Sequence, residues 1–502
     1  MAATLLPDLA NVQGDILLRG LPKETETFAF FTITNGTKFC KLLRTVATEE
    51  ISHTQNTLDT RKQIKDFKAN AGAAGPTTKL PTVGANISFS AKGLQKIAQA
   101  TGTDLKTGDA DFEAGMKSSA VGTLNDPKKD GSATPKWDDE WLNNNIDGVL
   151  LVAGNTTALV NEKLDRITKL FGDSMKLAFK HSGKVRPGEQ KGHEHFGYMD
   201  GVSQPVVSDL PNLTEEESAV PPGQDKIAQG VILCGRPGDV SAATRPAWTV
   251  DGSFLAFRKL KQNVQDFDNF LQTSANSLGV FKDQLGARLV GRWKSGCPIN
   301  LQPDFDDIKI GKDAKQNNLF EFDTDGINIE KIGLGGVLPA SRLVCPIGAH
   351  IRKTNPRGDQ PGGRAAVHQH RILRAGIPYG PEISEDAGAE RGLLFACYQS
   401  NLNQGFTFIQ QRWANNEAFR FQGGGVDAVM GQVNDKAEVD MLGLFPQDAS
   451  RPLKLPGINR FVVPKGGEYF FSPSMKALTG VLSEVKAAAA NGTNGTNGHK
   501  EL

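Results

Sequence analysis

Long apolar runs are absent from this 502-residue chain. A membrane-spanning helix needs roughly 18 or more consecutive apolar residues, so the sequence predicts no membrane partner. The first residues, MAATLLP, carry neither a charged start nor a long apolar stretch, so no secretory signal is visible. By sequence alone the expected location is the cytosol. The location stays open, because a processed chain with an added methionine would begin in the same way.

Charge of one sign is also absent. The chain has 57 Lys and Arg against 56 Asp and Glu, for a net charge of +1, so no global field favours nucleic acid and we expect no nucleic-acid partner. Cysteine is scarce. The five cysteines are odd in number, widely spaced and without a CxxC pair: Cys40, Cys234, Cys297, Cys345 and Cys397. This pattern disfavours a disulfide framework or a zinc site and predicts buried free thiols.

Several sequence signatures of enzymes are missing. None of the eight histidines forms an HExxH or HxxxH pair, so a zinc hydrolase is poorly supported. A dinucleotide-binding glycine motif after a strand, a Walker-type loop and a Gly-x-Ser-x-Gly elbow are lacking as well. Oxidisable aromatics are few, with 4 Tyr and 5 Trp against 27 Phe. That imbalance fits either drift in core composition or a protein that makes a strong oxidant.

The order of predicted elements defines the fold class. The first half predicts strands at 27–33, 86–89, 148–153 and 176–181, with helices at 41–51, from Ser90 onward and at 159–171. The second half predicts strands at 252–257 and 392–398 and helices at 263–271 and 401–413. We therefore expect an α+β fold with two tandem β-α-β-β-α-β units, each an antiparallel sheet with helices on one face.

The order of predicted elements also sets the expected bounds of the two units. We expect an N-terminal domain at 1–220 and a C-terminal domain at 221–486. The polar stretch 107–137 is expected to be a long surface loop. The stretch 487–502 repeats Asn-Gly-Thr and predicts a disordered tail.

Two segments far apart in sequence carry the groups of a heme peroxidase. Asp200 lies in Gly-Tyr-Met-Asp-Gly, a carboxylate beside a glycine turn, and His350 lies in an Arg-rich segment that Arg374 follows. Such groups could supply a base, an iron ligand and an electrophilic stabiliser. Taken alone, each residue could have a purely structural role. A lone histidine is often structural, and Asp is common in turns. Their combination favours the catalytic interpretation.

These segments resemble those of the dye-decolorizing peroxidases, and the whole chain is most similar to the long fungal members. The resemblance extends from about residue 11 to residue 473. Its motifs are Asn11–Ile16, Gly197–Gly201, Gly291–Trp293, Ala349–Arg357, Ile372–Gly380 and Gly392–Ser400. It implies two ferredoxin-like domains, with heme b held mainly by the C-terminal domain.

The resemblance assigns the heme-binding residues. His350 would be the iron ligand through a neutral imidazole, and its other ring nitrogen would donate to a carboxylate, for which Asp427 is the candidate. Arg357 and Arg352 would pair with heme propionates, although surface solvation is an equal possibility for Arg352. Gly201 completes the predicted heme-binding set.

On the opposite side of the heme, the resemblance implies that Asp200 moves the peroxide proton and that Arg374 stabilises the charge of oxygen–oxygen cleavage, which leads to a high-valent iron-oxo intermediate. Arg371 is the alternative arginine. Leu393 and Phe395 alternate along a strand, so they point the same way. The resemblance makes them walls of the distal pocket, and core packing is compatible with the same pattern.

The expected function is reduction of hydrogen peroxide coupled to oxidation of dyes, phenols and other aromatic compounds. Large dyes could not enter such a pocket, so electrons would travel through Tyr379 and Trp413, which match relay positions of fungal relatives. Either residue could instead be a buried structural aromatic. We expect a monomer or homodimer, and analogy with the fungal relatives would place it outside the cell. A non-catalytic heme-binding or heme-delivery protein is the alternative, and it would have no need of Asp200 or Arg374.

Overall fold

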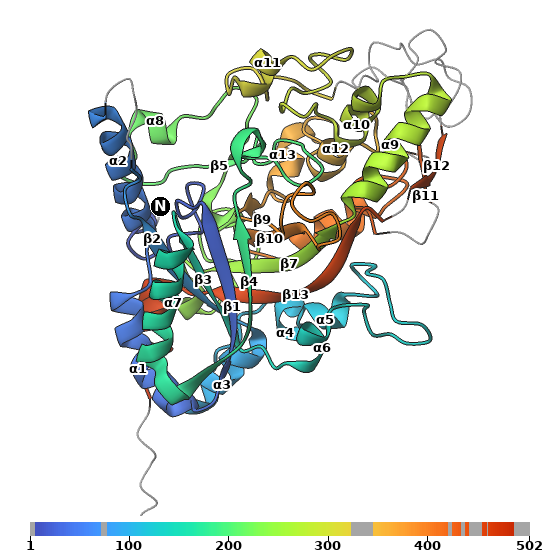
Figure 1. Ribbon diagram of the computed structural model, residues 1–502. Helices are drawn as coiled ribbons and strands as arrows, with labels where there is room; N and C mark the ends of the chain where they lie inside the picture. The colour runs from blue at the N-terminus through green and yellow to red at the C-terminus, as the bar shows by residue number, and fades with distance from the viewer. Residues whose placement is uncertain are drawn as a thin grey trace, which may run out of the picture.

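The computed structural model describes residues 6–71, 78–322, 345–419, 424–432, 437–440, 454–458 and 460–485. The tail expected to be disordered, 487–502, lies outside the described residues. Figure 1 shows a central curved sheet with helices packed around it. The chain forms two similar units whose strands join in that sheet.

The first unit has four strands, β1 (Thr25–Ile33), β2 (Val83–Phe89), β3 (Gly148–Gly154) and β4 (Met175–Lys184). They form an antiparallel sheet in the order β4-β1-β3-β2. Its helices are α1 (Gly36–Glu49), α2 (Thr54–Asn70), α3 (Ala91–Thr101), α4 (Ala110–Ala114), α5 (Met116–Ser119), α6 (Asp139–Asn143) and α7 (Thr157–Phe171). All four predicted strands are confirmed. Helix α1 begins earlier than predicted, because the Asn35 side chain accepts from the Lys38 N–H and caps it there.

The second unit repeats this strand order. Its strands are β7 (Ser253–Gln262), β8 (Leu373–Arg374), β9 (Ile377–Tyr379), β10 (Gly392–Gln399) and β13 (Val462–Ser472). They run in the order β13-β7-β10-β8, and β9 also pairs with β10. Its helices are α9 (Val264–Leu278), α10 (Lys282–Val290), α11 (Ile308–Lys312), α12 (His350–Thr354), α13 (Gly363–His368), α14 (Phe406–Phe408) and α15 (Met475–Thr479), and a π-helical segment spans Ile409–Ala414. The predicted strands at 252–257 and 392–398 are confirmed.

Smaller elements connect the units. Helix α8 (Glu215–Ser218) lies between β5 (Val206–Val207) and β6 (Lys226–Ile227), which pair in parallel. The domain boundary expected at residue 220 therefore falls between two paired strands. A second small sheet joins β11 (Ala437–Asp440) to β12 (Lys454–Ile458).

One expectation is corrected. The stretch 107–137 is not a plain surface loop, because it carries α4 and α5 and buries Phe112 and Met116. The Met116 N–H donates to the Glu468 carboxylate on β13 at 2.8 Å, which fixes α5 against the sheet. Polar residues outnumber apolar ones here, so the pattern could not reveal the few buried anchors.

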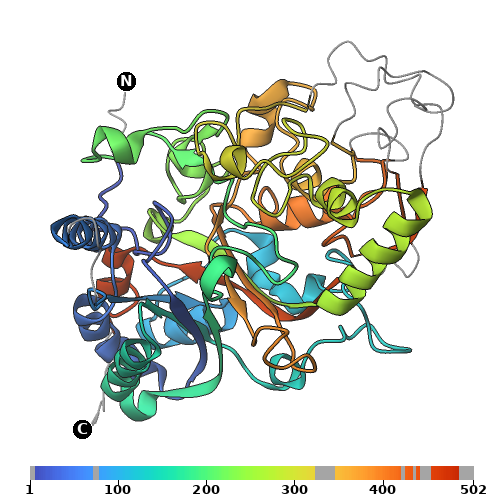
Figure 2. The same cartoon turned by 45° about the horizontal axis from the view of Figure 1, so that its top comes forward.

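The two units close on each other as a barrel. Phe28 and Phe30 of β1 pack against Phe257 of β7, with ring centroids 4.6 and 5.1 Å apart. At the far edges, a Cβ on Gly183 of β4 would lie 2.3 Å from Ile377 of β9, so only glycine permits this approach. Figure 2 shows the strands of both units curving around this shared interior.

A buried glutamine joins the two units where the sheet itself is weakly paired. Between β2 and β13 the ladder consists of one residue pair, Phe89 with Phe471. Gln13, with 0% exposure, donates to the Ile87 and Pro473 carbonyls at 2.9 and 2.8 Å and accepts from the Ile87 N–H at 2.8 Å. One side chain therefore satisfies backbone groups of both units.

We predict that Gln13→Leu lowers the free energy of unfolding by about 2–4 kcal/mol, because it leaves three buried backbone groups without partners. The matched control is Gln265→Leu, since Gln265 is exposed on α9. Chemical denaturation of both variants measures the difference. Equal stability of the two variants would contradict this role for Gln13.

Candidate functional site

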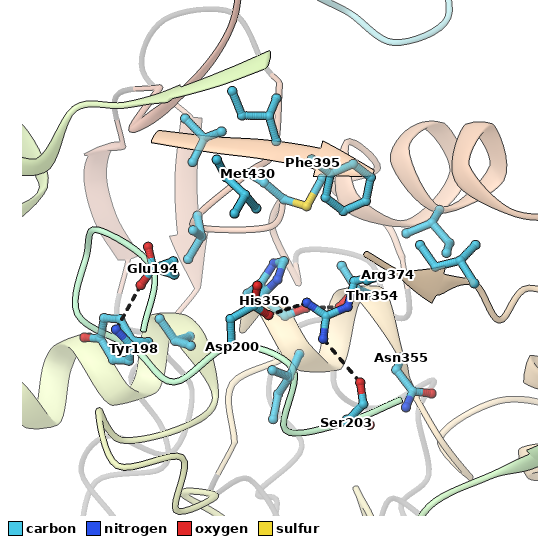
Figure 3. A pocket seen from close by; sticks show the side chains of 18 of the residues that line it. Glu194, Tyr198, Asp200, Ser203, His350, Thr354, Asn355, Arg374, Phe395 and Met430 are labelled. Carbon is cyan, nitrogen blue, oxygen red and sulfur yellow. Dashed lines mark hydrogen bonds and ion pairs between the residues drawn. The ribbon is translucent and has the colours of Figure 1, made fainter. Parts of the chain in front are cut away.

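A cavity of about 250 Å³ lies between the loop that follows β4 and the second unit, and it brings together the segments singled out in the sequence. Its walls come from the loop 194–204, β7, α12, β8, β10, the π-helical segment and the turn 429–432. Figure 3 shows His350, Asp200 and Arg374 grouped in it, with Phe395 and Met430 across from them. Of the predicted site residues, the cavity is lined by Asp200, Gly201, His350, Arg357, Arg374, Leu393 and Phe395.

His350 begins α12 and is held by Asp427. Its Nδ1 lies 2.8 Å from Oδ2 of Asp427, whose other oxygen accepts from the N–H groups of Val429 and Met430 at 2.9 and 3.0 Å. Burial alone would lower the pKa of His350, but the charge and hydrogen bond of Asp427 raise it above its ordinary value. The predicted contact between His350 and Asp427 is present.

The same contact fixes which nitrogen faces the cavity. With Nδ1 bound to Asp427, Nε2 is the ring atom left for a ligand, and no described residue occupies it. Among the described residues no group of three or more His, Cys, Asp or Glu side chains could hold a bare metal ion. A metal at His350 would therefore need most of its ligands from a cofactor, which fits a heme.

Asp200 and Arg374 form an ion pair in the cavity. Nη1 of Arg374 donates to Oδ1 of Asp200, its Nη2 donates to the Ser203 carbonyl at 3.2 Å, and the Gly201 N–H donates to Oδ1 of Asp200 at 2.6 Å. Removal from bulk water would raise the pKa of Asp200. The charge and hydrogen bond of Arg374, together with the Gly201 N–H, outweigh that effect and lower the pKa below its usual value. Asp200 is therefore held as the carboxylate.

The loop that carries Asp200 is fixed by a partly buried acid, Glu194. Glu194 accepts from the N–H groups of Phe196 and Tyr198 at 2.8 and 2.9 Å and from the Gln262 side chain on β7. Gly197 and Gly201 adopt φ values of +93° and +75°, which side chains rarely tolerate. The glycine spacing of the motif thus permits the turn that presents Asp200.

Arg374, rather than Arg371, contacts Asp200. Arg374 lies on β8 opposite Cys397 of β10, and Gln204 binds its backbone on both sides, at 2.8 Å to the carbonyl and 3.2 Å to the N–H. Arg371 also lines the cavity, but its Nε lies 3.2 Å from Asp225. The geometry therefore separates the two arginines.

The strand alternation predicted for β10 is confirmed. Leu393 and Phe395 are its two partly exposed positions before Ala396, and both line the cavity, whereas Leu394 between them is fully buried in the core. Phe395 packs against Phe406 with ring centroids 6.0 Å apart. One apolar wall of the cavity is thus a strand face.

The predicted propionate arginines differ in their environment. Arg357 lines the cavity while its guanidinium donates to the carbonyls of Gly223, Asn318 and Phe320 at 2.9–3.0 Å. Arg352 is not part of the cavity lining. Its buried guanidinium donates to Asp359 at 2.7 Å and to the Cys345 carbonyl at 2.6 Å, which makes it a structural group.

Three cavity arginines were not among the predicted heme-binding or catalytic residues: Arg258, Arg292 and Arg371. Arg258 is ion-paired with Asp126 at 2.7 Å. Burial lowers the pKa of Arg292 and of Arg371 to about 10, partly offset by neighbouring cysteines for Arg292 and by Asp225 for Arg371, so both are cations at neutral pH. Arg292 lies in the Gly-Arg-Trp motif at 291–293. That motif was the sequence feature that could have indicated its place in the cavity.

The predicted relay residues lie outside the cavity lining. Trp413 is buried, with 4% exposure, and contacts His370, a lining residue, edge-on at 5.2 Å between ring centroids. Tyr379 is partly buried on β9, and its hydroxyl donates to Glu390 at 3.0 Å. Trp413 itself is therefore not a surface residue.

Comparison with known proteins shows the family. Residues 11–187 match the DyP dimeric alpha+beta barrel domain, and residues 235–421 match the C-terminal domain of Dyp-type peroxidases. The dye-decolorizing peroxidase msp1 of Mycetinis scorodonius is 38% identical over 95% of this chain and 88% of its own.

Solved structures agree. An ancestral D-type dye-decolorizing peroxidase is 40% identical, with a TM-score of 0.81 over 95% of this chain and 99% of that one. A variant of the dye-decolorizing peroxidase of Pleurotus ostreatus is 38% identical, with a TM-score of 0.82 over 95% and 99% of the two chains. The chain belongs to the dye-decolorizing peroxidase family, whose members depend on heme, and it is an enzyme of that class. Among the described helices, none has the length and apolar character needed to cross a bilayer.

We predict that His350 in the heme-free protein titrates above the ordinary histidine value of about 6.5. In Asp427→Asn the raising charge is gone while burial remains, so the pKa should fall below that value. Nitrogen-15 NMR of the imidazoles measures both, with His350→Gln to assign the signal. An unchanged pKa in the Asn variant would show that Asp427 does not control His350.

Proposed function

We propose that this chain reduces hydrogen peroxide at a heme b bound through His350 and oxidises phenols, dyes and other aromatic compounds with the oxidising power gained. The observation that carries the proposal is that His350, hydrogen-bonded to Asp427, lines the same cavity as the Asp200–Arg374 pair. A bound heme would supply the iron that takes up peroxide and stores its oxidising equivalents.

The cavity offers a binding residue for each part of that cofactor. His350 would ligate the iron through Nε2, and Asp427 would make the imidazole a stronger electron donor. Arg357 and Arg371 would face the propionates, since both line the cavity as cations. Gly201 would allow the backbone to approach closely, because nothing lies within 4 Å of where its Cβ would be. We leave Arg352 out of the heme-binding set because its guanidinium is already bonded to Asp359.

Asp200 and Arg374 would divide the work on peroxide. Asp200, held ionised by Arg374, would take a proton from one peroxide oxygen and return it to the other as water leaves. Arg374 would stabilise the negative charge that develops on the departing oxygen. Leu393 and Phe395 would keep bulk water and bulky substrates from the reacting atoms.

Small phenols and large dyes would then be oxidised differently. A relative has been solved in complex with 2,6-dimethoxyphenol, which supports phenols as substrates of this chain. Bulky dyes would receive their oxidising equivalents through the protein. Tyr379, with its hydroxyl on Glu390, and Trp413, through His370, are the candidates for this relay.

We predict that His350→Ala abolishes or greatly weakens heme retention, since no other described residue offers a ring nitrogen held by a carboxylate in the cavity. The ratio of heme to protein absorbance after reconstitution and gel filtration measures this. The control is His53→Asn, because His53 lies outside the cavity as the N-cap of α2 and asparagine can keep that cap. Normal heme content in the His350 variant would refute the assignment.

We predict that Arg374→Leu slows the reaction with peroxide about 10²–10³-fold. It should also move the acid limb of the rate to higher pH. Asp200 must be ionised to act as a base, its pKa is lowered by Arg374, and without that charge burial alone would raise it. Stopped-flow absorbance across pH measures both effects, with exposed Arg44→Leu as control. An unshifted acid limb, or slowing in Arg371→Leu instead, would contradict the assignment.

We predict that the double variant Trp413→Phe, Tyr379→Phe oxidises a bulky anthraquinone dye more slowly while its reaction with peroxide stays near wild type. Phenylalanine keeps much of the packing and removes the oxidisable ring. Steady-state dye turnover and stopped-flow peroxide kinetics separate the two steps. Wild-type dye turnover would place the relay elsewhere.

A further inference from the structure

A lysine of the first unit reaches the strand that carries Arg374. Lys23 precedes β1, and its Nζ donates to the carbonyl of Ala375, the residue directly after Arg374. The same ammonium lies 2.8 and 2.9 Å from the two carboxylate oxygens of Glu26 on β1. Lys23 and Glu26 expose 16% and 0% of their side chains.

The peptide at Arg374 is held from several directions. The Ala375 N–H donates to the Ala396 carbonyl of β10 at 2.8 Å, and Gln204 binds the Arg374 backbone. Lys23 supplies the bond to the Ala375 carbonyl, and it comes from a residue 352 positions away in the sequence. Strand β8 has two residues, so its position depends on such side-chain contacts.

Lys23 also stands behind the Asp200–Arg374 pair. A second cavity of about 190 Å³ is lined by Lys23, Arg186, His193 and the segment 376–378, which contains the start of β9. Its remaining lining includes Asp200, Gly201, Gln204 and Arg374, which also line the larger cavity. The ion pair therefore lies between the two cavities, and Lys23 lines the second one.

The ammonium of Lys23 is itself held in place by buried acids. Glu26 and Asp15 are both buried, and Asp15 accepts from the Tyr398 hydroxyl of β10 at 3.0 Å. Burial raises the pKa of Glu26 to about 7, and Asp15 adds to this, while the charge of Lys23 opposes it. Glu26 can thus become neutral at modest cost if Lys23 is lost.

We propose that Lys23 is a positioning residue for Arg374. Its bond to the Ala375 carbonyl ties the peptide after Arg374 to the first unit. This bond keeps the Arg374 guanidinium within reach of Asp200. The inference rests on the role proposed above for Arg374. Lys23 takes no part in the chemistry, so its loss should impair the peroxide step and leave heme binding and the use of reducing substrate intact.

The test compares two variants that differ at Lys23 alone. Glu26→Gln removes the buried acid and keeps the bond from Lys23 to Ala375. Lys23→Met with Glu26→Gln removes the ammonium too, and it does not leave Glu26 as an unpaired buried charge. Both heme-loaded proteins are measured for the stopped-flow rate constant with hydrogen peroxide, the dissociation constant of cyanide, and KM for a small phenol.

We expect Glu26→Gln to behave like wild type. Relative to it, the double variant should react with peroxide about 10- to 100-fold more slowly, the scale of a small misplacement of a reacting group. Its cyanide binding should weaken, while its heme content and its KM for the phenol should not change. Equal peroxide rates and cyanide affinities in the two variants would overturn the proposal. A loss of heme in the double variant alone would also overturn it, because Lys23 would then support the cofactor site rather than Arg374.

Arg374→Leu, measured alongside, separates the proposed role of Arg374 from the proposed role of Lys23. If it leaves the peroxide rate unchanged, the proposed role of Arg374 fails. If it slows the reaction while the double variant matches Glu26→Gln, only the role of Lys23 fails.

Discussion

The ion pair between Asp200 and Arg374 is the interaction on which the site depends. It joins the loop that follows the strands of the first unit to a two-residue strand, β8, of the second unit. Desolvation in the cavity raises the pKa of Asp200, and the charge and hydrogen bond of Arg374 outweigh that effect. Together the two residues keep a carboxylate ionised and a guanidinium directed into the same cavity as His350. The catalytic proposal follows from that arrangement.

The barrel explains how two distant segments meet so closely. Each unit has an incomplete share of the site, because Asp200 follows β4 while His350, Arg374 and the apolar wall belong to the second unit. The Phe28 and Phe257 rings pack the shared interior, and Gln13 and Lys23 bind backbone groups of the opposite unit. The contacts of Gln13 and Lys23 are polar and largely removed from water, so they fix relative position as well as stability.

The sequence predicted the four strands of the first unit, β7, β10 and the alternation of Leu393 and Phe395, but not β13, because such predictions depend on local patterns alone. The pairing of His350 with Asp427 came from resemblance, since 77 positions separate the two. The sequence did not predict that Arg371 lines the cavity or that Lys23 binds the Ala375 carbonyl. Contacts between residues far apart in the chain leave no local pattern. The prediction of a surface loop at 107–137 was wrong because a few buried residues, such as Phe112, lie among many polar ones.

A double-mutant cycle on the peroxide reaction tests the central claim most directly. The stopped-flow rate constant is measured for wild type, Asp200→Asn, Arg374→Leu and the variant with both changes. If the two groups act as one unit, the combined variant should be scarcely slower than the worse single variant, so the losses are not additive. Losses that multiply independently, or a combined variant that reacts like wild type, would contradict the account.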